Sequence, residues 1–234
     1  MIIGFSNTYS TKPKYIYTNG TVGQEAQNIN PYLVDAPDIL ISSRGSALCS
    51  VPRMTKGNQP SDGGNLILSQ DERNDLLAKD VSVAPCVRRY VGSKDFINHD
   101  EVRYCLWLKG ISPVVYRKNA EVMRRLEAVR QMRLASSAAP TRALAEKPYL
   151  FFSTPQTDSN YLCIPEVSSE RRRYIPIGFM DKDIIASNKL LIVPDATLYH
   201  FGVLTSNVHM AWTRTVCGRL KSDYQYSGAT VYNN

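Results

Sequence analysis

The chain has 234 residues, with 28 Lys and Arg against 21 Asp and Glu and a formal charge of +7. Hydrophobic residues make up 43% of it, an ordinary globular composition that argues against a disordered chain. No apolar run approaches the ~18 residues that span a bilayer, and Met1 to Gly4 is too short and uncharged for a signal peptide. We therefore expect no membrane partner and a cytoplasmic location.

The first predicted elements lie between residues 63 and 77. The stretch 66–68 is apolar and follows a Gly-Gly-Asn turn, which predicts a short strand. Ser69 and Glu72 have the spacing of a capping box, with Ser69 as the N-cap. A helix is therefore expected to continue through Leu77.

The middle of the chain predicts a strand and a long helix. The stretch 102–108 is rich in aromatic and β-branched residues, which favours a strand. Apolar residues recur at helical spacing over 119–136, the clearest helix of the sequence. We expect Pro140 to end this helix.

The last third predicts a buried strand over 190–193, closed by Pro194. A helix is expected over 206–216 and should be stopped by Gly218. The segment 220–226 is predicted to be extended. Together these elements predict an α+β fold of mixed short-stranded sheets with a few helices.

The cysteines are odd in number and far apart. No C-x-x-C pair occurs, which argues against a zinc ribbon or finger. We expect reduced and mostly buried thiols. The five residues are Cys49, Cys86, Cys105, Cys163 and Cys217.

Basic residues cluster in three places. The stretch 117–142 holds seven basic and two acidic side chains. A second cluster is 171–173, and a third contains Arg214, Arg219 and Lys221. Such clusters suit a polyanion such as nucleic acid, although a solvated helix face is the simpler alternative.

Catalytic motifs are absent from the sequence. There is no P-loop and no G-x-G-x-x-G loop to hold a nucleotide. Asn30-Pro31-Tyr32 has only one of the two prolines in the Asn/Asp-Pro-Pro-Tyr/Phe tetrapeptide of amino-methylating enzymes. The chain alone should therefore not transfer methyl groups, and we expect no catalytic residue, metal site or cofactor in it.

A polar pattern near the C-terminus suits the reading of DNA bases. In an extended strand, Lys221, Asp223 and Gln225 would share one face. Lys donates to guanine O6/N7, Asp accepts from cytosine N4, and Gln pairs with adenine N6/N7. Lys221 and Asp223 could together read one G·C pair, or form only a surface ion pair.

Four long stretches carry a family resemblance: 28–38, 57–68, 167–178 and 209–224. The chain resembles the target recognition domain of MmeI-like (type IIL) restriction-modification enzymes, which are bacterial and methylate adenine N6. The resemblance implies a sequence-specific domain that binds double-stranded DNA in the major groove. It also implies a methyltransferase domain on the same full-length chain, which would bind S-adenosylmethionine. By this resemblance, 1–40 is the tail of the methyltransferase domain and 41–234 is the recognition domain, excised just after Asn234.

The resemblance also assigns roles to individual residues. Lys221 and Asp223 match a pair that selects one base pair, and relatives with the charges swapped to Glu and Arg read the opposite orientation. The other two matching pairs are Glu166 with Asn188 and Lys189 with Gln225. Glu166 is expected to accept from cytosine N4. Gln225 stands where relatives often have Arg, which leaves its base open.

Other basic and hydroxyl residues are expected to contact phosphate, which sets register without reading sequence. About half of the candidates should touch DNA, because a helix presents only one face to a partner. The candidates are Arg124, Arg130, Arg133, Ser168, Ser169, Arg171, Arg172, Arg214 and Arg219.

Two alternatives remain open from the residues alone. A small stand-alone hydrolase would use a cysteine or histidine with a strongly perturbed pKa. An RNA-binding module would stack exposed aromatic side chains on unpaired bases, and the 14 tyrosines are compatible with that.

Overall fold

The structure is a computed structural model that describes residues 8, 10–18, 20 and 22–234. It divides into two compact units, Met1–Ser43 and Arg44–Asn234, which are described separately. The expectation for Met1 to Gly4 lies outside the described residues, as does part of the expected tail 1–40. Within the described part of the chain, no helix has the length and apolar character needed to cross a membrane.

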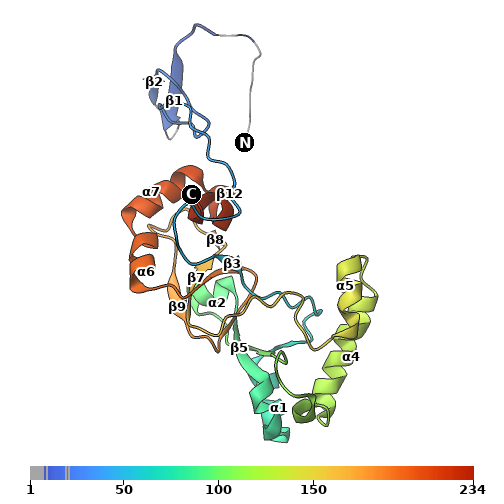
Figure 1. The fold of residues 1–234 in the computed structure, drawn as a ribbon. Helices are drawn as coiled ribbons and strands as arrows, with labels where there is room; N and C mark the ends of the chain where they lie inside the picture. The colour runs from blue at the N-terminus through green and yellow to red at the C-terminus, as the bar shows by residue number, and fades with distance from the viewer. Residues whose placement is uncertain (1–7, 9, 19, 21) are drawn as a thin grey trace. The chain divides into compact units, whose positions relative to one another are not determined.

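The first unit contains a β-hairpin (Figure 1). Strands β1 (Lys14–Thr18) and β2 (Val22–Ala26) pair in antiparallel orientation. A loop follows in which the Asn28 side chain donates to the Ala36 carbonyl at 2.8 Å and to Asp38 Oδ1 at 2.9 Å. The Asn28 side-chain amide thus links the start of this loop to its end.

Three small sheets form the frame of the second unit (Figure 1). The first, β10-β5-β6-β4, comprises Ile185–Ala186, Val87–Val91, Arg103–Leu106 and Ile67–Leu68. The second, β3-β11-β7-β9, comprises Thr55–Lys56, Leu190–Pro194, Tyr161–Pro165 and Gly178–Met180. The third, β12-β13-β8, comprises Gly218–Leu220, Asp223–Gln225 and Val167–Ser168. These short strands, interspersed with helices, confirm the predicted α+β class.

Seven α-helices accompany the sheets in the described part of the chain. They are α1 (Gln70–Lys79), α2 (Ser93–Asn98), α3 (Pro113–Tyr116), α4 (Ala120–Leu134), α5 (Ala139–Ala143), α6 (Leu198–Leu204) and α7 (Asn207–Val216). Other helical turns are η1 (Val81–Cys86), η2 (Leu144–Glu146) and η3 (Gly228–Tyr232). The capping box is present: Ser69 Oγ accepts from the Glu72 amide at 3.1 Å, and Glu72 Oε2 accepts from the Ser69 amide at 2.8 Å. The helices expected over 119–136 and 206–216 are confirmed as α4 and α7.

Two predicted helix ends are wrong. Pro140 does not end α4, which stops at Leu134; it lies in the first turn of α5, where its missing N–H costs nothing. Gly218 does not cap α7 either. Cys217 leaves the helix with extended backbone, and Gly218 begins strand β12.

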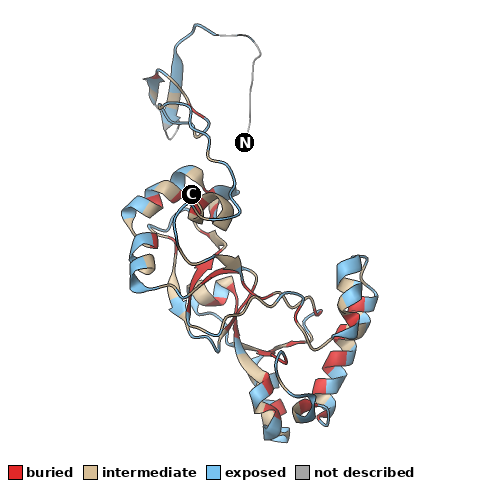
Figure 2. Ribbon diagram, in the orientation of Figure 1, coloured by how far each residue is buried: buried red, intermediate tan, exposed pale blue. Residues whose placement is uncertain are grey.

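The buried residues gather between the sheets and the helices that cover them (Figure 2). One cluster joins the first sheet to one face of α4, through Leu106, Val122 and Val129 among others. Another joins the second and third sheets to α6 and α7, and it includes Met210 and Tyr226. This second cluster underlies the surface formed by the third sheet and the loops beside it.

Candidate nucleic-acid interface

Main-chain hydrogen bonds join three segments that are far apart in the sequence. The Glu166 amide donates to the Lys189 carbonyl at 3.1 Å, and the Tyr226 amide donates to the Glu166 carbonyl at 2.8 Å. Beyond this point β13 pairs with β8, with Gln225 opposite Val167. The segments that carry Glu166, Lys189 and Gln225 therefore lie side by side. We call this arrangement the main-chain ladder.

The segment 220–226 is a hairpin and not one continuous strand. Leu220 pairs with Asp223 across a two-residue turn, in which Lys221 has a left-handed φ of 58°. Alternation along a single strand therefore does not relate Lys221 to Asp223, and that expectation is wrong. Asp223 and Gln225, two residues apart in β13, do share a face. Lys221 lies at the exposed tip of the hairpin.

Arg219 braces this hairpin. Its guanidinium carbon lies 4.0 Å from the centre of the Tyr224 ring, and its Nη1 donates to the Ser222 carbonyl at 3.0 Å. Asp223 Oδ1 accepts from the Glu170 amide at 3.3 Å. Contacts within the protein thus hold the turn and the Asp223 side chain in place.

Glu166 has a charged partner that sequence analysis missed. Lys56 in β3 places its Nζ 2.7 Å from Glu166 Oε1. The Glu166 side chain is 17% exposed, whereas that of Lys56 is 63% exposed. No local signal identifies this pair, because its members are 110 residues apart in the chain.

The loop that carries Asn188 and Lys189 is fastened at several points. The Asn188 amide donates to the Asn58 carbonyl at 2.9 Å, and the Lys189 amide donates to Ser187 Oγ at 3.2 Å. Asn58 is fully buried, and its side chain donates to the Ala186 carbonyl at 3.0 Å. Asn188 is half-buried and Lys189 is exposed, so both side chains reach the surface from a fixed backbone.

The expected phosphate contacts fall into two groups. One group lies in or beside the third sheet, on its strands β8 and β12, on the loop after β8 and on α7. The other group, on α4, lies at the opposite end of the second unit (Figure 1). Arg124 and Arg130 of the α4 group pair with acidic neighbours on the same helix. The partly or fully exposed members of the first group are Ser169, Arg171, Arg172, Arg214 and Arg219.

Two phosphate candidates are not accessible. Arg133 is fully buried, and its five N–H groups donate to five main-chain carbonyls, those of Pro60, Ser61, Leu144, Lys147 and Leu150. It is a structural residue with no donor left for DNA. Ser168 is 3% exposed because it faces inward beside Tyr224 on the buried side of the third sheet. Contrary to the expectation from the sequence, the side chains of Arg133 and Ser168 do not reach the surface where phosphate would bind.

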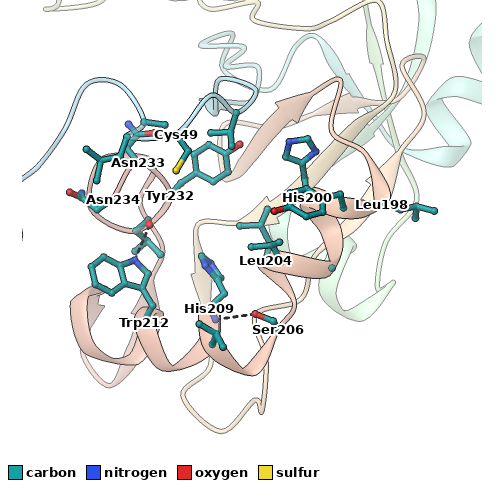
Figure 3. A pocket seen from close by; sticks show the side chains of 18 residues that line it. Cys49, Leu198, His200, Leu204, Ser206, His209, Trp212, Tyr232, Asn233 and Asn234 are labelled. Atoms are coloured by element: carbon teal, nitrogen blue, oxygen red, sulfur yellow. Dashed lines mark hydrogen bonds between the residues drawn. The ribbon is translucent and has the colours of Figure 1, made fainter.

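An apolar pocket of about 870 Å³ lies between α6, α7 and the segment 47–51 (Figure 3). None of the six expected reading residues lines it. Cys49, His200 and His209 do line it, but among the described residues no cysteine sulfur is hydrogen-bonded to a histidine ring. The pocket thus holds no hydrogen-bonded Cys–His pair.

The buried thiols are not activated. Desolvation raises the pKa of Cys105 and Cys163, and it raises the pKa of Cys217 to about 11. A nucleophilic cysteine requires the opposite shift, because the thiolate is the reactive form. These three thiols therefore behave as core residues.

The near match to a methyltransferase tetrapeptide has a structural role. Asn30 is buried, its Oδ1 accepts from the amides of Tyr32 at 3.0 Å and Val34 at 3.3 Å, and its Nδ2 donates to the Pro37 carbonyl. The side chain is thus occupied within its own loop. The Asn30-Pro31-Tyr32 segment does not fit the task of holding a target amine beside a methyl donor.

The family model described as the MmeI target recognition domain matches residues 35–234. This chain belongs to that family. It is 36% identical over 233 residues to DNA methyltransferase A of Bacillus subtilis (strain 168), and it spans 26% of that protein's length. The solved structure of the type IIL restriction-modification enzyme MmeI in complex with DNA is also similar, with 42% identity and a TM-score of 0.86. That match covers 91% of this chain and 28% of the MmeI chain.

Proposed function

We propose that this chain recognises a short asymmetric site in double-stranded DNA. The observation that carries the proposal is the main-chain ladder, which holds the segments of Glu166, Lys189 and Gln225 side by side. Asp223 shares the face of Gln225, and Lys221 is exposed at the adjoining turn. These side chains supply both donors and acceptors, as the edges of base pairs in the major groove require.

Each proposed contact follows hydrogen-bond chemistry. Asp223 accepts from cytosine N4 while Lys221 donates to the guanine of the same pair. Glu166 accepts from a second cytosine, with Asn188 as its partner in recognition. Lys189 and Gln225 read a third position. The exposed arginines around the third sheet contact phosphate and fix the register.

We further propose that the chain acts as the recognition part of a longer bacterial adenine-N6 methyltransferase. The chain spans only about a quarter of the curated relative it matches, which supports a separate catalytic part. S-adenosylmethionine and the target adenine would be held by that part of the protein. A cytoplasmic location follows from a DNA substrate in a bacterium. The hydrolase and RNA-binding alternatives have no support in the comparisons.

The test is selection from a randomised duplex pool at two salt concentrations, followed by sequencing of the bound fraction. We expect an enriched short motif with fixed C·G pairs, and affinity that falls steeply as salt rises because phosphate contacts release counterions. Binding without enrichment would contradict sequence recognition by this chain. Preference for single-stranded RNA over the duplex would favour the RNA-binding alternative.

A further inference from the structure

Lys56 lies in a segment that is bonded directly to the loop of Asn188. Strand β3 pairs with β11, where Lys56 is opposite Leu191. The next residue, Gly57, donates its amide to the Leu190 carbonyl at 2.8 Å. The backbone that carries Lys56 is therefore fixed relative to the main-chain ladder, so the side chain projects from a defined point beside it.

The contact between Lys56 and Glu166 leaves both groups with unused hydrogen-bonding capacity. Lys56 Nζ has three N–H donors, and one of them is directed at Glu166 Oε1. Within the described residues Lys56 is the only charged partner of the Glu166 carboxylate. A pair with one partner this exposed adds little to stability, so folding alone gives weak reason for it.

The arrangement presents a donor and an acceptor side by side. In the major groove, a C·G pair displays the cytosine N4 amino group next to the guanine O6 and N7 acceptors. We propose that Lys56 is a specificity-determining residue that reads one C·G pair together with Glu166: Glu166 accepts from cytosine N4, and Lys56 donates to the guanine. This inference rests on the proposed function and adds a seventh reading residue to it.

A phosphate contact by Lys56 is the competing role, and the geometry disfavours it. A phosphate oxygen that approached Nζ would also approach the Glu166 carboxylate, which lies 2.7 Å from that nitrogen. Like charges at such separations repel. A base pair that offers an amino group to the carboxylate and an acceptor to the ammonium meets no such repulsion.

The experiment compares Lys56→Met with Glu166→Gln in the duplex-pool selection. Lys182→Met is the matched control, since Lys182 is also a surface lysine beside a carboxylate, with its Nζ 3.4 Å from Asp183 Oδ2. Lys182 lies just beyond β9, at the end of β7 away from Glu166. We expect Lys56→Met to weaken the preference for C·G at one position by roughly 5- to 150-fold. That position should be the one that Glu166→Gln relaxes, and Lys182→Met should change none.

Two further variants keep the test independent of folding effects. Lys56→Gln also removes the charge and should relax the same position, whereas Lys56→Arg keeps the donors and should retain the preference. Uniform weakening with a shallower salt dependence would identify a phosphate contact and overturn the inference. An unchanged preference, or a change at a position that Glu166→Gln does not affect, would also overturn it. If the unsubstituted chain selects no motif, the proposed function itself fails, and this inference fails with it.

Discussion

His209 Nε2 lies 2.8 Å from the hydroxyl oxygen of Tyr226, which joins helix α7 to the residue that follows strand β13. Tyr226 also donates its amide to Glu166, so the contact supports the ladder from the interior of the protein. Burial of the imidazole lowers the pKa of His209 from 6.5 to about 4. The ring is therefore neutral throughout the physiological range.

This pKa predicts a specific dependence of stability on pH. Between pH 6.5 and about 4 the unfolded chain binds a proton at His209 that the folded chain does not. The contribution of the neutral His209 to the free energy of unfolding should therefore be fully present above pH 6.5. It should be lost as the pH drops towards 4, which lowers the free energy of unfolding by on the order of 3 kcal/mol. Urea unfolding across this range checks it. His209→Gln should flatten that part of the profile, and an unchanged profile would show that the imidazole is not the cause.

Arg133→Met should destabilise the fold severely. It would leave five main-chain carbonyls without the donors they now have, and each carbonyl that water cannot reach costs about 1–3 kcal/mol. We expect the free energy of unfolding to fall by at least about 3 kcal/mol in urea titrations. Arg124→Met is the matched control on the same helix, since Arg124 is exposed and its surface ion pair should add little to stability. Similar losses in the two variants would refute the structural role of Arg133.

Gly57→Ala should disrupt the contact between β3 and the loop of Asn188. A Cβ atom at position 57 would lie 2.7 Å from the Ala186 carbonyl oxygen and closer still to that of Ser187. Both are main-chain atoms that cannot rotate away, so we expect a loss of roughly 1–3 kcal/mol in thermal or urea unfolding. Gly45→Ala serves as the control, because no atom lies within 4 Å of its added Cβ. A neutral Gly57→Ala would mean that the two segments are not in close contact.

Exchange of Lys221→Glu together with Asp223→Arg in the full-length protein should switch one position of the recognised site from G to C. The hairpin should survive, since Glu is no worse than Lys at the positive φ of the turn. Sequencing of methylated DNA provides the measurement. Loss of all methylation, or an unchanged site, would count against recognition by this pair.

Local signals in the sequence predicted the elements that depend on neighbours in the chain. The capping box at Ser69 and the apolar spacing of α4 each act within a few residues, and both helices form. The sequence did not predict the hairpin at Lys221, because a two-residue turn is usually recognised by a Gly or Asn at the position with left-handed φ. A lysine there carries no such signal.

The features that the sequence did not predict depend on contacts between residues far apart in the chain. Arg133 resembled its exposed neighbours on α4, and its carbonyl partners Pro60 and Ser61 come from a loop more than 70 residues earlier. Lys56 was overlooked for the same reason, because only the fold brings it to Glu166. Burial and pairing of this kind depend on tertiary contacts, which no local pattern encodes.

The ladder at Lys189, Glu166 and Tyr226 consists of peptide groups, so it does not depend on which side chains those positions carry. A substitution on the outward surface therefore leaves the supporting bonds in place. Evolution can replace one reading side chain at a time without passing through an unfolded intermediate. Related chains are thus expected to diverge in the DNA sites they choose through substitutions at a few surface positions while their architecture stays constant.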